Sequence, residues 1–417
     1  MAVDRPFADP AFLVDPYPVY ARLRSEAPVV QDAATGDWIV TGYAASIAAL
    51  GDGRLSSDRT AVYLADFPEE TRERLRPFAR LRTDMMLFVD PPKHTRLRGL
   101  VNRAFTPRVI EALRPRIAAL VDEMLAPARE RGEFDVIADL AEPLPGVVIA
   151  ELLGVPPVDR PAFKRWSDDF VRAIGGAVTP QIAEQAQASM LAMKEYLRDA
   201  AEERRVRPGD DLLSGLVATE AEDDRLTEDE VLATCALLLF AGNETTTNLI
   251  GNGILALLRH RDQWDRLRAE PTLIRMAVEE FLRYDSPVQG TVRVAAADLD
   301  LGDAGIGRGA RVSLMLAAAN RDPAQFPEPD KLDVARGERR HLAFGLGPHF
   351  CLGAALARLE GQIAIAAVVE QFPALRLMTE PPDWKPSVFF RGLRTLPVAC
   401  WPSPMTHNRT MTSSVRL

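Results

Sequence analysis

Apolar residues recur at helical spacing in several long stretches of the chain. The clearest examples are residues 117–125, 181–205 and 352–370. Such spacing gathers apolar side chains on one face and predicts amphipathic helices. Short stretches rich in β-branched residues occur at residues 38–41, 292–296 and 311–314. They are few and do not alternate with helices as in a parallel βαβ sheet. The pattern therefore predicts a mainly α fold with small β-sheets.

One predicted helix is unusually long and has an unusual centre. Thr227 and Glu230 have capping-box spacing, and helical character continues to Arg259, which corresponds to about 50 Å. Residues 241–248 in its middle read Ala-Gly-Asn-Glu-Thr-Thr-Thr-Asn, which includes several poor helix formers. A functional site and a polar helix crossing are both compatible with this segment.

Composition narrows the functional class. The 417 residues carry a net charge of −9, whereas nucleic-acid binders are more often basic. Three cysteines make no disulfide framework, and no apolar stretch approaches the ~20 residues that span a bilayer. The N-terminus lacks the pattern of a secretory signal. We expect a cytoplasmic protein without nucleic-acid or membrane partners, with one domain over residues 1–401 and a disordered tail over 402–417.

The most informative segment is residues 344–353, Phe-Gly-Leu-Gly-Pro-His-Phe-Cys-Leu-Gly, directly before a predicted helix. A helix N-terminus favours a thiolate at Cys351, and the glycines allow a tight loop whose amides turn toward the sulfur. A buried, inert cysteine is the simpler interpretation. A zinc site needs three or four clustered Cys or His ligands, and the sequence has no such cluster.

This segment resembles the heme-binding loop of the cytochrome P450 family, Phe-Gly-x-Gly-x-His/Arg-x-Cys-x-Gly, at every fixed position. The resemblance implies the cytochrome P450 fold and a heme b whose iron is bound by Cys351. It also implies that Phe344, Gly353 and Ala241 contact the heme. His94, Arg98, Arg293 and His349 match positions that bind heme propionates in this family, although each could be a surface charge.

Further motifs extend the resemblance over nearly the whole chain. Glu280 and Arg283 match the family's Glu-x-x-Arg pair, and Arg336 matches its third, structural partner. Residues 241–245 match the family's oxygen-binding segment. By this resemblance Thr245 donates a hydrogen bond to oxygen above the iron, and Glu244 relays protons. One departure is Arg339, where many bacterial members have Asn.

The resemblance implies a monooxygenase that inserts one oxygen atom from O2 into a lipophilic molecule such as a steroid, terpenoid, fatty acid or polyketide. The expected pocket residues are mostly apolar. They are Met85, Met86, Leu87, Phe88, Phe240, Val288, Gln289, Thr291, Val292, Val388, Phe389 and Phe390. Arg391 has two possible partners, a substrate carboxylate or Asp383.

Electrons are expected from NAD(P)H through a separate ferredoxin and ferredoxin reductase, with the enzyme as a monomer. Lys93, Arg96 and Arg103 are a candidate basic docking patch, or else a solvated helix face. Two alternatives remain: a peroxide-driven heme peroxygenase, and a non-catalytic heme sensor or carrier. The presence of both Glu244 and Thr245 argues against each of these.

Overall fold

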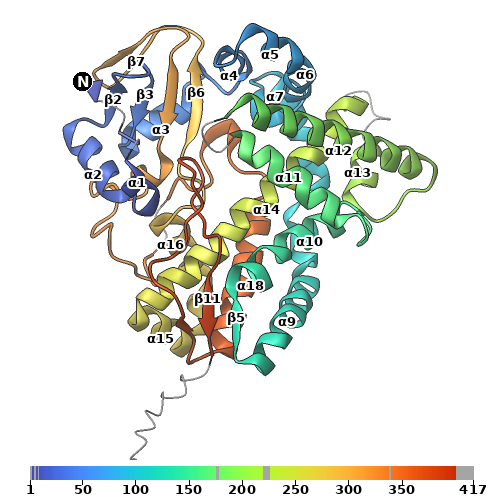
Figure 1. The fold of residues 1–417 in the computed structure, drawn as a ribbon, viewed down its shortest axis with the longest axis vertical. Helices are drawn as coiled ribbons and strands as arrows, with labels where there is room; N and C mark the ends of the chain where they lie inside the picture. The colour runs from blue at the N-terminus through green and yellow to red at the C-terminus, as the bar shows by residue number, and fades with distance from the viewer. Residues whose placement is uncertain are drawn as a thin grey trace, which may run out of the picture.

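The computed structural model describes residues 2–3, 6–7, 9–174, 178–218, 226–337 and 340–400. The predicted disordered tail, residues 402–417, and Arg339 lie outside these ranges. The predicted mainly α architecture with small sheets is confirmed (Figure 1).

Helices account for most of the described chain. The α-helices are α1 (Pro10–Val14), α2 (Tyr17–Glu26), α3 (Tyr43–Gly51), α4 (Thr60–Ala65), α5 (Glu69–Arg74), α6 (Arg76–Arg82), α7 (Lys93–Ala104), α8 (Pro107–Ala112), α9 (Arg114–Arg131), α10 (Pro143–Leu152), α11 (Arg160–Ile174), α12 (Pro180–Val206), α13 (Leu212–Ala218), α14 (Glu228–Arg259), α15 (Arg261–Ala269), α16 (Ile274–Tyr284), α17 (Leu316–Ala319) and α18 (Ala354–Gln371). Shorter helical turns are η1 (Met86–Phe88), η2 (Ile137–Ala141), η4 (Pro271–Leu273) and η5 (Gly347–His349).

The strands form three sheets. They are β1 (Ala2–Val3), β2 (Val29–Asp32), β3 (Trp38–Val40), β4 (Leu55–Ser56), β5 (Glu133–Asp135), β6 (Thr291–Ala295), β7 (Leu299–Leu301), β8 (Ala304–Ile306), β9 (Arg311–Leu314), β10 (Arg376–Leu377) and β11 (Pro397–Ala399). The sheet orders are β1-β2-β3-β9-β6-β4, β10-β11-β5 and β7-β8. In the largest sheet, β9 pairs parallel with β3 and antiparallel with β6. The three predicted strand stretches therefore meet as neighbours in one sheet.

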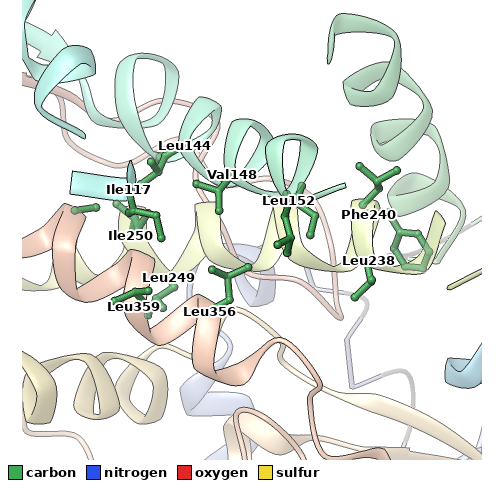
Figure 2. Packing of buried hydrophobic residues seen from close by; sticks show 14 of the residues in the cluster. Ile117, Leu144, Val148, Leu152, Leu238, Phe240, Leu249, Ile250, Leu356 and Leu359 are labelled. Carbon is green, nitrogen blue, oxygen red and sulfur yellow. The ribbon is translucent and has the colours of Figure 1, made fainter. Parts of the chain in front are cut away.

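Helix α14 is the central element of the helical part. The Thr227 hydroxyl accepts from the Glu230 amide and the Glu230 carboxylate accepts from the Thr227 amide, which confirms the predicted capping box. The helix packs against α10 on one side and α18 on the other, with Val148, Leu249 and Leu356 among the contacting side chains (Figure 2). Burying an aliphatic side chain contributes roughly 1.5–3 kcal/mol. Because α14 is buried on several faces, it is a rigid support for the polar segment at its centre.

The other predicted helices are present with different bounds: α9 and α12 are longer than their apolar patterns, whereas α18 begins at Ala354 rather than at residue 352. The stretch 117–125 lies within α9, which ends where Gly132 adopts φ +76°. Helix α12 begins where the Thr179 hydroxyl accepts a hydrogen bond from the Ile182 amide. Within the described ranges, no helix is both long and apolar enough to cross a membrane.

Candidate active site

A cavity of about 620 Å³ lies between α14 and the loop before α18. Ala241, Glu244 and Thr245 line it from α14, and Phe344, Cys351 and Gly353 line it from the loop. The structure thus brings together the two motifs that the sequence separates by about a hundred residues. Strand β6 and the turns around residues 86–87 and 389–390 contribute further wall.

The loop that carries Cys351 folds back on itself. Gly345 and Gly347 have φ values of +69° and +73°, which disfavour other residues. The Cys351 amide donates to the Phe344 carbonyl at 2.9 Å, and Arg98 of α7 donates to the Phe350 carbonyl at 2.7 Å. These contacts hold Cys351 at the cavity wall.

A charged cluster supports this loop from behind. Glu279 of α16 bonds with Arg358 of α18 at 2.6 Å and with His341 at 3.0 Å. The Arg358 guanidinium also stacks 4.4 Å from the centre of the Phe344 ring. Burial acts to raise the pKa of Glu279, but its bonds with His341 and Arg358 prevail and lower it to about 2. The carboxylate is therefore ionised at neutral pH and fixes Phe344 through Arg358.

The thiol of Cys351 has an environment that differs from the sequence-based expectation. Burial raises its pKa above the ordinary value, which outweighs the lowering effects of the Gly353 amide and of the Arg98 and Arg358 charges. The predicted lowering of the Cys351 pKa by a backbone amide at the helix start is present, but the effect of burial is larger. A bound metal cation deprotonates a thiol directly, and this would supply the missing stabilisation of the thiolate.

The predicted propionate-binding residues meet at one part of the cavity. His94, Arg98, Arg293 and His349 all line it, and the two imidazole rings lie 4.1 Å apart. Both ring nitrogens of His94 and Nε2 of His349 are buried without a hydrogen-bond partner in the described part of the chain. Burial lowers the pKa of Arg293 to about 10, so this residue stays cationic at neutral pH. Unmatched donors and buried positive charge indicate that this wall receives an acidic ligand.

Glu244 and Thr245, the acid–alcohol pair on α14, both form hydrogen bonds within the protein. Thr245 donates its hydroxyl proton to the Ala241 carbonyl at 2.9 Å. The Glu244 carboxylate accepts from Lys385 at 2.9 and 3.0 Å and from Asn248 at 3.2 Å. Lys385 comes from the C-terminal segment, and no local sequence signal pointed to it. Lys385 is partly exposed, so Glu244 is paired with a cation that contacts solvent.

Most of the predicted substrate-pocket residues line the cavity, namely Met86, Leu87, Phe240, Val288, Thr291, Val292, Phe389 and Phe390. The prediction is wrong for Met85, Phe88, Gln289 and Val388, which are not part of its wall. Met85 directly precedes the tight turn η1 and Phe88 ends it, whereas Met86 and Leu87 line the cavity. Successive side chains of such a turn point in different directions. Gln289 bonds with Tyr20 at 3.1 Å and with the Ser286 carbonyl at 2.7 Å, and Val388 packs against the cluster around Tyr20.

Several cavity residues were not predicted. Arg59, Tyr63 and Arg82 line the cavity from the segment between β4 and η1, and Ile149 and Ile174 line it from α10 and α11. Arginines are mostly surface residues, so sequence alone gave no reason to place Arg59 and Arg82 inside.

The predicted structural network forms as expected. Arg283 contacts the two Glu280 oxygens at 2.7 and 2.9 Å, and Arg336 contacts Glu280 at 3.1 Å. Glu280 and Arg283 are each only 2% exposed. Arg283 also donates to the Asn320 and Pro329 carbonyls, so the buried charges have partners on several sides.

The prediction for Arg391 needs correction, whereas the docking patch stays a prediction. Arg391 is not among the residues that line the cavity; it contacts Asp285 at 2.7 Å and stacks on Trp384, while Arg394 lies 3.5 Å from Asp383. In the candidate docking patch, Lys93 pairs with Asp84 at 2.9 Å and Arg96 pairs with Glu230. Neighbouring acids therefore offset part of the positive charge that the sequence suggested.

Comparisons with known proteins agree with this site. The family model "Cytochrome P450" matches residues 63–391. The chain is 45% identical over 396 residues to cytochrome P450 monooxygenase PikC of Streptomyces venezuelae, covering 93% of this chain and 91% of that protein. It is 44% identical over 397 residues to vitamin D(3) 25-hydroxylase of Pseudonocardia autotrophica, with coverages of 94% and 95%. It is also similar to the crystal structure of P450BioI in complex with hexadec-9Z-enoic acid ligated acyl carrier protein, with TM-score 0.88 and 38% identity over 94% of this chain and 100% of that one.

The chain belongs to the cytochrome P450 family, and it is an oxidoreductase of the monooxygenase type. The family implies a heme-thiolate cofactor. The observed donors fit such a group, because Cys351 faces the same cavity as the unpartnered His94 and His349 nitrogens and the buried Arg293.

Proposed function

We propose that this enzyme inserts one oxygen atom of O2 into a lipophilic small molecule: a steroid, terpenoid, fatty acid or polyketide. Electrons would come from NAD(P)H through a separate ferredoxin and its reductase. The observation that carries the proposal is a single cavity lined by Cys351, by the Glu244–Thr245 pair and by mainly apolar side chains.

The cofactor in this proposal is heme b. Cys351 would bind the iron through Sγ, and His94, Arg98, Arg293 and His349 would hold its carboxylates. Phe344, Gly353 and Ala241 would contact the heme, and Gly353 leaves room for it because no atom of the described residues lies within 4 Å of a Cβ built there. When bound, the heme supplies the iron centre at which O2 is activated, and electron donation by the thiolate favours O–O cleavage.

In this proposal Thr245 and Glu244 donate and transfer protons. The Thr245 hydroxyl donates its proton to the Ala241 carbonyl, and its place on the cavity wall would allow it to donate elsewhere. Glu244 can take up protons on the Lys385 side and deliver them toward Thr245, which is a general-acid role. A peroxygenase or a heme sensor would not need this pair.

The proposed substrate class rests on the cavity wall and on relatives. Met86, Leu87, Phe240, Val292 and Phe389 give it an apolar character that suits lipophilic ligands. A relative named vitamin D(3) 25-hydroxylase and another named 6-deoxyerythronolide B hydroxylase, from Saccharopolyspora erythraea, are consistent with this class.

The ligand assignment is tested with Cys351→Ser and, as control, Cys400→Ser, a half-buried cysteine outside the cavity. The reduced wild type and the control should show the strongly red-shifted Soret band of a thiolate–carbon monoxide complex, and Cys351→Ser should lose it. Retention of the band by Cys351→Ser would show that another residue binds the iron.

Turnover tests the reaction class. With O2, NAD(P)H and a surrogate ferredoxin system, the wild type should form a product that contains one oxygen atom from 18O2. Product formed only with hydrogen peroxide would favour the peroxygenase, and no product under either condition would favour the sensor or carrier.

A further inference from the structure

Arg82, the last residue of α6, is a buried cation that has no acidic partner among the residues that the structure describes. Its side chain lines the cavity, and the residue is only 2% exposed. The guanidinium lies 4.1 Å from the centre of the Phe88 ring and 4.6 Å from that of Tyr63. Nε and Nη1 have no hydrogen-bond partner in the described ranges, and no ion pair with Arg82 is found there. Buried charges are normally paired, so this arrangement indicates a missing ligand.

Two neighbouring polar side chains also have few or no hydrogen-bond partners in the described part of the chain. The Tyr63 hydroxyl is buried and likewise lacks a hydrogen-bond partner among the described residues. Arg59 lies 4.8 Å from the Phe88 ring centre, and its one hydrogen bond within the described chain goes to the Val292 carbonyl at 3.3 Å. Arg59, Tyr63 and Arg82 all line the same cavity. We call these three residues the α4–α6 cation site.

Both arginines stay charged at neutral pH. Burial lowers the pKa of Arg82 to about 10, and burial together with Arg293 and Arg82 lowers the pKa of Arg59 to about 9. The charge of Asp58 acts to raise the pKa of both arginines. Asp58 is exposed, however, so water screens its charge. The part of the wall around Arg59 and Arg82 therefore holds positive charge that the exposed Asp58 offsets only weakly.

The heme carboxylates do not account for this excess. Arg98 and Arg293 already match two carboxylates in charge, and His94 and His349 supply further nitrogens. The charge of Arg59 contributes to the lowered pKa of His349, whereas Arg82 is not among the causes of that shift. Arg82 is instead surrounded by the rings of Tyr63, Phe78 and Phe88. Such aromatic surroundings suit the substrate part of the cavity better than a heme-carboxylate site.

We propose that the α4–α6 cation site binds the carboxylate of the substrate, which is therefore a lipophilic acid rather than a neutral lipid. The inference rests on the proposed function and narrows its substrate class. One carboxylate accepts from the Arg82 guanidinium and from the Tyr63 hydroxyl, and the apolar part of the molecule extends toward Cys351. Arginine suits this role because its planar fork matches a carboxylate.

The test compares hexadecanoic acid with its methyl ester, and a steroid carboxylic acid with its methyl ester, by Soret titration of the heme-loaded protein. The wild type should bind each acid about 10-fold to 100-fold more tightly than its ester. Arg82→Met should abolish this preference and leave the ester dissociation constants unchanged. Arg80→Met removes the same charge from an exposed position on α6 and should preserve the preference.

Two further variants keep the test decisive if Arg82→Met folds poorly. Arg82→Lys should retain part of the acid preference, and Tyr63→Phe should reduce it while heme content stays normal. Equal binding of acids and esters by the wild type overturns the proposal. Loss of heme from both Arg82→Lys and Arg82→Met would assign Arg82 to the heme carboxylates and overturn it as well.

Failure of the proposed function gives a different result. In that case no oxygen-containing product forms with any ligand, or the carbon monoxide complex lacks the thiolate band. The acid-to-ester binding ratio is measured without turnover, so it reports on the α4–α6 cation site independently.

Discussion

Gly347 in the cysteine loop can be tested by replacement with alanine. Its φ of +73° is unfavourable for alanine by roughly 1–2 kcal/mol, and the reduced entropy of the unfolded chain offsets about 0.4–1 kcal/mol. A Cβ at this position would also lie 3.0 Å from the Leu50 carbonyl oxygen, a backbone atom of α3. Relieving such a contact typically costs about 1–3 kcal/mol. We expect Gly347→Ala to lower the free energy of unfolding by about 2–3 kcal/mol.

Two control substitutions separate the cost of a positive φ from the cost of the contact with Leu50. Gly309 has φ +85°, and no atom of the described residues lies within 4 Å of a Cβ built there; Gly345 has φ +69° with the nearest such atom at 3.9 Å. Gly309→Ala and Gly345→Ala should each cost only about 1 kcal/mol. Urea unfolding gives the free energies, and the thiolate–carbon monoxide band reports whether the loop still presents Cys351. Equal destabilisation by all three substitutions would refute the role of the Leu50 contact.

Two further predictions concern protons at the site. Thr245→Ala should keep heme and substrate binding but divert NAD(P)H electrons to hydrogen peroxide, because a hydroxyl donor is lost; unchanged coupling of NAD(P)H use to product would contradict its role. Glu279 has a lowered folded-state pKa of about 2 against 4.5, so it contributes stability that is complete above pH 4.5 and is lost as the pH falls toward 2. The contribution is about 3 kcal/mol, so Glu279→Gln should flatten the decline in urea-unfolding free energy as the pH falls from about 4.5 to about 2. A variant curve parallel to the wild type would show that Glu279 does not cause the acid sensitivity.

The sequence by itself determined the helix framework and the chemical centre of this protein. Capping residues and apolar periodicity depend on neighbours within a few positions, so the α14 start at Thr227 could be predicted from local rules. The ligand loop was recognisable for the same reason, since its glycines, His349 and Cys351 lie within ten consecutive residues. The Glu280–Arg283 pair also lies on adjacent turns of one helix.

Tertiary structure decided which polar groups lie inside the cavity and what they contact. Lys385 forms a hydrogen bond with Glu244, which lies 141 positions away in the sequence. Arg391 pairs with Asp285 rather than with Asp383. Met85 and Met86 are adjacent, yet only Met86 lines the cavity, because one residue of rotation in a tight turn changes the direction of a side chain. Arg82 resembles any surface arginine in sequence, and only the packing of Tyr63, Phe78 and Phe88 around it removes it from water. Burial depends on long-range contacts that no local pattern encodes, so the charges that select a substrate emerge only when the chain is folded.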